Sequence, residues 1–506
     1  MKIERTKNTV RNIATGSLNR IINIILPFFT RTAILYIMGT KYLGLSSLFS
    51  SILSFLSLAE LGVGGAMVYS MYKPIAQNDD KTICALLNLY KKFYRIIGSV
   101  VLVLGLLLMP FLSELINDDI PAEINLHLLY LIYLINAVLS YWLFAYKNAL
   151  LQAHQRDDVN SSIASIITPL SYAVMLLALF VTRNYYAYVM WLPIFTIITN
   201  FIRSRYVDRH YANLKPAGDI SPELRTSITK KVTALIGTKL NTVVLNAADN
   251  LVMSAFLGLT AIAIYGNYYY IMSSIIGFLG IIYSAMTAGL GNSLQTETIE
   301  KNYADFKKLS FMNSWLVGWC TVCLICLYQP FMRIWTGEEL MFPFYVVLQL
   351  GLYFYIYQIR KIPVVYKDAA GIWWEDRFRP YVCMVVNVVF NIVLVQIIGI
   401  SGIILSTVFS LVISIPWENY TIFKYVFHRG SAEYYGKMAY YAAVMFAGGG
   451  LTYWICNFFD DSILCFFLRG VVCVVVPNVV FICLNYRRQE FKDSMAMIKR
   501  ILNRQF

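Results

Sequence analysis

Long apolar runs, each about as long as a membrane-crossing helix, follow one another along most of this 506-residue sequence. A helix needs roughly 20 mostly apolar residues to cross the hydrocarbon core of a bilayer. Only 14% of the residues are charged, whereas a soluble globular chain has roughly a quarter, so this chain cannot cover a water-facing surface. The pattern predicts an all-α polytopic membrane protein. About fourteen transmembrane helices are expected, over residues 13–38, 43–71, 93–113, 124–146, 159–181, 186–206, 232–257, 260–290, 309–332, 341–365, 380–398, 402–423, 438–458 and 462–486.

Lysine and arginine concentrate in every second connecting segment. Of the 42 basic residues, 35 lie in one alternating set of segments and three, Lys41, Arg183 and Arg333, lie in the other. Cytoplasmic loops collect Lys and Arg, so this split predicts an even number of spans with both termini in the cytoplasm. The same rule accounts for the net charge of +14 without a nucleic-acid partner.

The sequence also carries an internal repeat. A shift of 219 residues without gaps places the first predicted helix on the seventh, with Arg20 on Lys239 and Gly39 on Gly258. The shift covers an even number of spans, so the two copies share one orientation, which predicts parallel repeats as in many transporters. The expected organisation is an N-terminal lobe of helices 1–6 (1–208), a cytoplasmic linker (209–231), a C-terminal lobe of helices 7–12 (232–430), helices 13 and 14 (431–486), and a basic amphipathic cytoplasmic tail (487–506).

Several ionisable residues fall inside the predicted spans, where charges commonly face an aqueous cavity or a partner. Arg20 and Arg31 lie about three turns apart near one face of the first helix, and Lys239 lies in the seventh. A central cavity that presents these cations suits an anionic headgroup, above all a phosphate or diphosphate. Asn23 and Asn246 would add hydrogen-bond donors for sugar hydroxyls.

Structural pairing is the alternative for these charges. Arg31 would then pair with Glu60, and Lys239 with Asp249, only to hold helices together. For Arg469 in the last span, extension of the side chain to the nearby outer interface is the simpler expectation.

The motifs of several other function classes are absent from the sequence. There is no G-x-x-x-x-G-K-[ST] and no H-E-x-x-H, and the four His residues are far apart. The C-x-x-C-x-x-C run at 320–326 has no His or second Cys pair beside it, so apolar packing of thiols is expected rather than a metal site. We therefore expect no cofactor, no metal and no enzymatic activity.

Four segments resemble Wzx-type polysaccharide flippases of the multidrug/oligosaccharidyl-lipid/polysaccharide exporter superfamily. They are RTAILYIMGTKYLGL at 31–45, LAELGVGGA at 58–66, YKPIA at 72–76 and ADNLVMSAFLGLTAIAIYGNY at 248–268. The resemblance implies a multi-pass protein of the bacterial cytoplasmic membrane that flips an undecaprenyl-diphosphate-linked oligosaccharide to the outer leaflet for capsule, O-antigen or exopolysaccharide synthesis.

The resemblance also implies roles for individual residues and partners. Arg20, Arg31 and Lys239 would bind the diphosphate or acidic sugars, and Glu60 and Asp249 would be candidates for coupling to H⁺ or Na⁺. Two lobes would alternate in access, in contact with membrane lipids and with a polysaccharide polymerase as a further partner. One alternative is a drug/cation antiporter of the same fold. A membrane polysaccharide polymerase is another, with less support because the outside loops are short.

Overall fold

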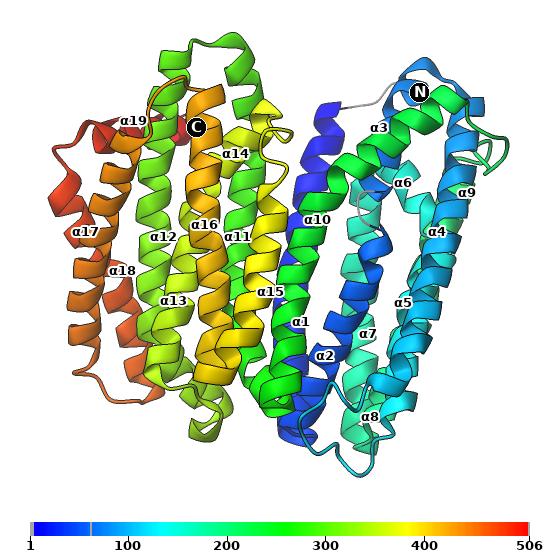
Figure 1. Ribbon diagram of the computed structural model, residues 1–506, viewed down its shortest axis with the longest axis horizontal. Coiled ribbons are helices and arrows are strands. Elements are labelled where there is room, and N and C mark those ends of the chain that lie inside the picture. Colours follow the sequence, from blue (N-terminus) through cyan, green and yellow to red (C-terminus); the bar gives the residue numbers. More distant parts are fainter. Residues whose placement is uncertain (1–4, 61–62, 504–506) are drawn as a thin grey trace. The chain divides into compact units, whose positions relative to one another are not determined.

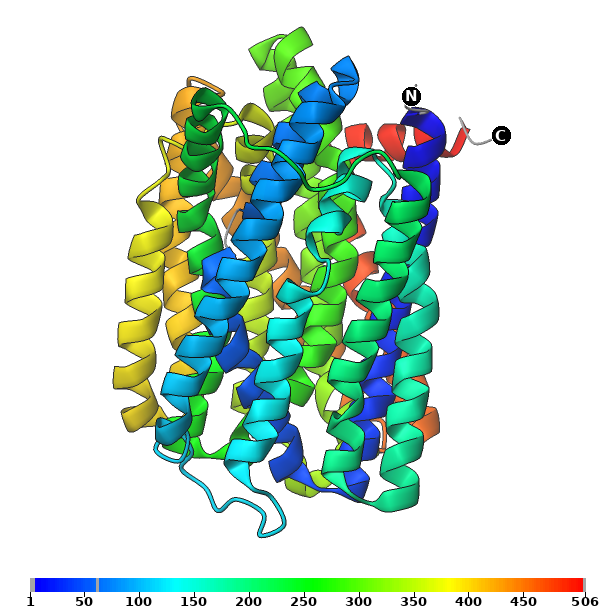
Figure 2. The ribbon, with the colours of Figure 1, turned by 90° about the vertical axis from the view of Figure 1, so that its right-hand side faces the viewer.

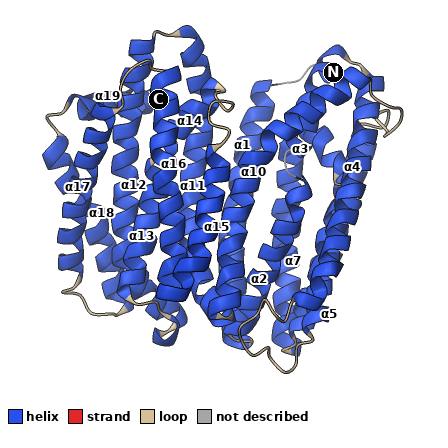
Figure 3. Cartoon of the chain, viewed as in Figure 1, coloured by secondary structure: helices blue, strands red, loops and turns tan. Residues whose placement is uncertain are grey.

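The protein is helical wherever it has regular secondary structure, as the sequence predicted (Figure 3). The computed structural model describes residues 5–60 and 63–503. Within them, the side chains of some helical residues lie outside the described part: 5–10, 13–14, 59, 227, 230–239, 241–242, 246, 288, 498 and 500–503. No strand occurs in the described residues.

The chain divides into two compact units, Met1–Ala263 and Ile264–Phe506. Most helices of the first unit run side by side as long rods, with α1 packed on α7 and α4 on α5 (Figures 1 and 2). Its helices are α1 (Arg5–Ile37), α2 (Thr40–Leu56), η1 (Ser57–Glu60), α3 (Val63–Gln77), α4 (Asp80–Leu108), η2 (Met109–Phe111), α5 (Leu126–Trp142), α6 (Tyr146–Ala153), α7 (Asp157–Thr182), α8 (Tyr185–Val189), α9 (Trp191–His210) and α10 (Pro222–Leu257).

In the second unit, α12 is the central helix and contacts α13, α14, α17, α18 and α19. Its core holds stacked and edge-on aromatic rings, with the Phe306 ring 4.9 Å from that of Phe427 and 5.2 Å from that of Tyr366. The helices are α11 (Leu259–Thr296), which starts in the first unit, α12 (Ile299–Thr336), η3 (Glu338–Leu340), α13 (Phe344–Ile359), α14 (Lys361–Ala370), α15 (Arg379–Ile398), α16 (Ile400–Tyr425), α17 (Ala432–Cys456), α18 (Ile463–Asn485) and α19 (Gln489–Asn503).

In the described residues, each predicted span falls on one helix or on two or three successive helices. Of the described helices, nine are long and apolar enough to cross a membrane alone, and the pair α5 and α6, bent by 50°, adds a tenth. This count is lower than fourteen partly because two predicted spans are broken, one into α2, η1 and α3 and the other into α13 and α14. The protein is a multi-pass membrane protein, and fourteen spans with cytoplasmic termini remain a prediction.

The two compact units divide between residues 263 and 264. The predicted lobes, whose boundary lies in 209–231 so that α10 opens the second lobe, remain a prediction. In the structure α10 packs on α2 and α3, and the Asn250 side chain donates to the Ser51 hydroxyl at 2.8 Å. These contacts place α10 in the first unit.

Two glycines that the 219-residue shift superposes have the same backbone conformation. Gly39 follows α1 with φ +97° and ψ 174°, and Gly258 follows α10 with φ +84° and ψ 178°. Their N–H groups donate to the carbonyls of Ile34 and Met253, at 3.1 and 3.0 Å, and these two residues are also 219 apart. A positive φ at a helix end favours glycine, so the shared residue has a shared physical cause. The match supports the internal repeat.

Ion pairs near the helix ends join segments that the sequence assigned to the same side of the membrane. Lys41 binds Asp118 at 2.8 Å, and Arg333 binds Asp461, each within the predicted outside set. Within the predicted inside set, Arg11 binds Asp158 at 2.7 Å. The pairing agrees with the predicted order of inside and outside segments.

Candidate functional site

A polar cavity of about 930 Å³ lies inside the first unit. Its walls come from α2, η1, α3, α5 and α7 to α10. Most of the lining residues carry a hydroxyl or amide group, which are the groups that bind sugar hydroxyls. The polar lining residues are Ser46, Ser50, Ser54, Ser57, Glu60, Tyr133, Asn136, Tyr141, Thr168, Ser171, Tyr172 and Tyr188.

Helical spacing explains how an apolar sequence builds this lining. Ser46, Ser50 and Ser54 are four residues apart, so they form one stripe along α2. The opposite side of α2 is buried against its neighbours through Leu45, Leu48 and Phe49. One helix therefore presents hydroxyls to the cavity and hydrocarbon to the core.

Glu60 is the one carboxylate among the described lining residues. It lies in η1, where the predicted span is broken between α2 and α3. The Tyr94 hydroxyl donates to Glu60 Oε1 at 2.5 Å, and the Tyr90 hydroxyl donates to that of Tyr94 at 2.8 Å. A chain of three ionisable side chains thus leads from the cavity wall into α4.

A second pocket of about 350 Å³ adjoins the cavity through Thr168 and Ser171, which line both. It is also rich in hydroxyl and amide groups, and it reaches the guanidinium of Arg203 on α9. The Thr196 hydroxyl donates to Asn136 Oδ1 at 2.7 Å and joins α9 to α5 where the two pockets meet. The combined surface carries an anionic group in one pocket and a cationic group in the other.

Of the residues predicted for the site, Glu60 lines this cavity. Arg20 and Asn23 are exposed on α1, and the Asn23 amide donates to the Asn19 carbonyl at 2.7 Å. Arg31 is half-buried on the same helix, and Asp249 is 7% exposed on α10.

The side chains of Lys239 and Asn246 lie outside the described residues. The predicted cationic cavity therefore remains a prediction, and the polar cavity of the first unit is a separate feature. The lining described for it contains no Lys or Arg.

Sequence reasoning missed the neutral part of the site. Charges within the spans indicate only Glu60, whereas the cavity is built mainly from serine, threonine, asparagine and tyrosine. The available signal was the serine stripe at 46, 50 and 54 within an apolar run, together with Thr168, Ser171 and Met175 at helical spacing on α7.

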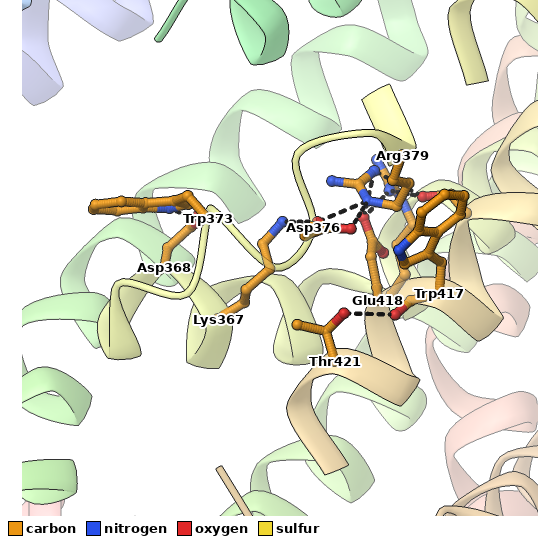
Figure 4. Close-up of polar contacts among 10 residues, drawn as sticks. Lys367, Asp368, Trp373, Asp376, Arg379, Trp417, Glu418 and Thr421 are labelled. Atoms are coloured by element: carbon orange, nitrogen blue, oxygen red, sulfur yellow. Dashed lines mark hydrogen bonds and ion pairs between the residues drawn. The ribbon is translucent and has the colours of Figure 1, made fainter. Parts of the chain in front are cut away.

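The second unit contains a buried network of charges (Figure 4). Glu418 on α16 is 1% exposed and accepts from Arg360 at 2.8 Å and from Arg379 at 2.9 Å. Arg379 also donates to Asp376 at 2.8 Å, and Lys367 donates to the same carboxylate at 2.5 Å. Three cations share two carboxylates, so the buried Glu418 has the structural pairing that charges inside spans require.

The first unit holds an equivalent of part of this network. Lys147, next to the break between α5 and α6, donates to Ser204 at 2.7 Å and to Asp208 at 2.6 Å. Arg360, at the break between α13 and α14, donates to Ser414 at 3.2 Å and to Glu418. In both cases the serine and the carboxylate are four residues apart on one helix. That helix is α9 in the first unit and α16 in the second, and in each unit it is the second long helix after the break. We call each arrangement of cation, serine and carboxylate a latch.

Comparison with solved structures shows which proteins share this fold. The lipid II flippase MurJ, in an inward closed conformation, superposes with a TM-score of 0.66 at 15% identity, over 94% of this chain and 98% of that one. An inward-facing multidrug resistance MATE family transporter of the MOP superfamily gives 0.60 at 14% identity, over 79% and 94%. An outward-facing MATE family transporter gives 0.54 at 13% identity, over 83% and 95%.

At these identities the comparison establishes the fold alone: the chain has the transporter fold found in the MOP superfamily. No protein-family model matches the sequence. No curated protein matches it either.

Proposed function

We propose that this protein flips a lipid-linked oligosaccharide, with undecaprenyl diphosphate as the lipid carrier, across the bacterial cytoplasmic membrane. The observation that carries the proposal is the cavity of the first unit, whose walls present hydroxyl and amide groups within a MOP-type fold. A sugar chain exchanges its hydrogen bonds with water for hydrogen bonds with such groups, whereas a hydrophobic drug gains little from them. The glycan would occupy the cavity while the prenyl tail stays in the lipid.

Binding of the charged part of the substrate is assigned to the predicted cations. Arg20, Arg31 and Lys239 would bind the diphosphate, since Arg forms paired hydrogen bonds to phosphate oxygens. Asn23 and Asn246 would bind sugar hydroxyls beside them. Alternating access of two lobes would carry the headgroup across, in a pathway that also requires a polysaccharide polymerase.

Glu60 is the residue that we assign to ion coupling. Its carboxylate lines the cavity and accepts the hydrogen bond of Tyr94. Binding of H⁺ or Na⁺ would neutralise the one negative charge in the described lining. It would also change the hydrogen bond between Glu60 and Tyr94 on α4. Asp249, which is buried on α10, is the second candidate.

The test is the sidedness of the lipid-linked oligosaccharide in a strain that lacks the gene. Intact spheroplasts are treated with a glycosidase or lectin that cannot enter. The proposal expects the oligosaccharide to accumulate in a form inaccessible from outside, and the wild-type gene to restore access. An accumulated product that is fully accessible would place the defect after translocation and favour a polymerase.

A drug/cation antiporter is the second candidate, because MATE transporters share the fold and because Glu60 offers a carboxylate to a cation. Drug susceptibility separates the two. The flippase proposal expects a deletion strain to keep its susceptibility to cationic drugs, whereas a marked rise in susceptibility, reversed by the gene, would favour the antiporter.

A further inference from the structure

Three cysteines from three different helices meet in the second unit. Cys326 lies on α12, Cys456 is the last residue of α17, and Cys473 lies on α18. Their sulfur atoms are all within 4.8 Å of one another, and the residues are 5%, 3% and 0% exposed. They are 130 and 17 residues apart in sequence, so only the fold brings them together.

The surroundings hold the three sulfurs in place. The Trp319 indole N–H donates to the Cys473 carbonyl at 3.0 Å, and the Cys323 thiol points to the same carbonyl at 3.8 Å. Val322 and Leu327 close the cluster with hydrocarbon. Cys323 packs against the cluster from α12, beside Cys473, and the three sulfurs that all lie within 4.8 Å of one another belong to Cys326, Cys456 and Cys473.

We propose that Cys326, Cys456 and Cys473 form a binding site for a soft, thiophilic metal ion of the Cu(I) class. Thiolate sulfur selects soft ions such as Cu(I) and also binds Zn²⁺. Structural Zn²⁺ almost always has four ligands, whereas this cluster offers three sulfurs and no His or carboxylate among its members. Three ligands from three helices suit an ion that accepts a coordination number below four.

Binding is an exchange of protons for the metal ion, without oxidation or reduction. Each thiol that becomes a thiolate ligand releases its proton to the medium. Arg469 lies one turn before Cys473 on α18 and binds Asp461 at 2.9 Å, so its positive charge is shared between that carboxylate and the thiolates nearby. The bound ion would tie α17 and α18 to α12.

The experiment titrates the reduced, full-length protein in detergent with Cu(I) under anaerobic conditions against a chromophoric Cu(I) chelator. The wild type is expected to retain one equivalent of Cu(I) with a thiolate-to-copper charge-transfer absorption. Cys326→Ser, Cys456→Ser and Cys473→Ser are each expected to lose that equivalent. Cys320→Ser, on α12 but outside the cluster, is the matched control and should retain it.

Three results would overturn the proposal. One is equal copper retention by the wild type and the triple Ser variant. Another is preference of the wild type for Zn²⁺ over Cu(I) in matched competition. The third is a disulfide among the three cysteines, found by alkylation of the denatured, unreduced protein.

Gel filtration of each variant checks that it is folded. Cys456→Ser, at a helix end, is the variant expected to disturb packing least. The copper readout is independent of transport, so it does not depend on the proposed flippase activity.

Discussion

Glu60 shows how a single side chain can be found from sequence and yet have unexpected surroundings. An acidic residue within an apolar run was predicted to be functional or paired with Arg31. The structure gives its carboxylate a tyrosine partner, Tyr94, and a place in the cavity wall, and its predicted role stays a prediction. The sequence does not indicate the tyrosine, because the span breaks at η1, between α2 and α3.

Replacement of Glu60 tests its role in coupling. Glu60→Gln keeps an oxygen that accepts from Tyr94 but removes the titratable charge, so the protein is expected to fold and to lose transport driven by an ion gradient. The expected loss in rate is at least about tenfold, equivalent to roughly 1.4 kcal/mol. The control is Glu114→Gln in a predicted outside loop. A Glu60→Gln protein with unchanged rate and unchanged pH dependence would remove the assignment.

Asp118 permits a prediction about stability and pH. Its carboxylate binds Lys41 at 2.8 Å and accepts the N–H of Leu259 at 3.2 Å at the start of α11. Burial alone would raise the pKa of Asp118, but the bond to the Lys41 ammonium and its charge outweigh burial and lower it. A carboxyl group whose pKa is lower in the folded state stabilises the fold above its unfolded pKa, about 4. That stabilisation is lost as the pH falls through the folded pKa.

Asp118→Asn should therefore lower the thermal stability of the protein at pH 7. Because the pair is partly exposed, the expected loss is about 1 kcal/mol or less. Melting temperatures in detergent at pH 7 and near pH 3 measure it, with Asp119→Asn as the neighbouring control. A difference between variant and wild type that is the same at both pH values would contradict this account.

At the scale of helices, the two latches differ in the burial of the carboxylate. In the second unit the side chain of Glu418 is 1% exposed and that of Arg360 is 14% exposed. In the first unit the side chain of Asp208 is 56% exposed, whereas that of Lys147 is 10% exposed. Removal of one partner from a buried pair leaves an uncompensated charge in a medium of low dielectric.

Unequal effects are therefore expected from equivalent substitutions. Glu418→Gln should destabilise the protein by about 3–5 kcal/mol, because the largely buried Arg360 loses its carboxylate and Arg379 keeps only that of Asp376. Asp208→Asn should cost less, about 1–2 kcal/mol, because water reaches the carboxylate of this pair although Lys147 is buried. Denaturation of the purified variants measures both. Equal losses at the two positions would show that burial does not control the strength of the latches.

The helices themselves were largely predictable, whereas their breaks were not. Apolar length determines where a span lies, and the described residues of each predicted span are mostly helical. The bend of 50° between α5 and α6 depends on Phe144, a non-glycine residue with φ +57°, and no apolar-length argument detects that. The neutral cavity was missed for a related reason, since serine stripes within apolar runs are weak signals beside charges.

On the scale of the whole molecule, the repeat is the feature that sequence and structure share most closely. The Gly39 and Gly258 conformations and the two latches are each found in corresponding places of the two copies. In the first compact unit α10 packs on α2 and α3, and the predicted lobes, which place α10 in the second lobe, remain a prediction. Sequence similarity identifies which helices are equivalent, and packing decides which unit holds each of them.

Flipping by the purified protein tests the central claim most directly. Proteoliposomes carry a lipid-linked oligosaccharide in both leaflets, an imposed ion gradient, and an external glycosidase that cannot cross the membrane. The account predicts that wild-type protein makes the inner-leaflet oligosaccharide accessible to the enzyme, and that Glu60→Gln does so far more slowly. Inner-leaflet oligosaccharide that stays protected in the presence of folded wild-type protein and the gradient would contradict it.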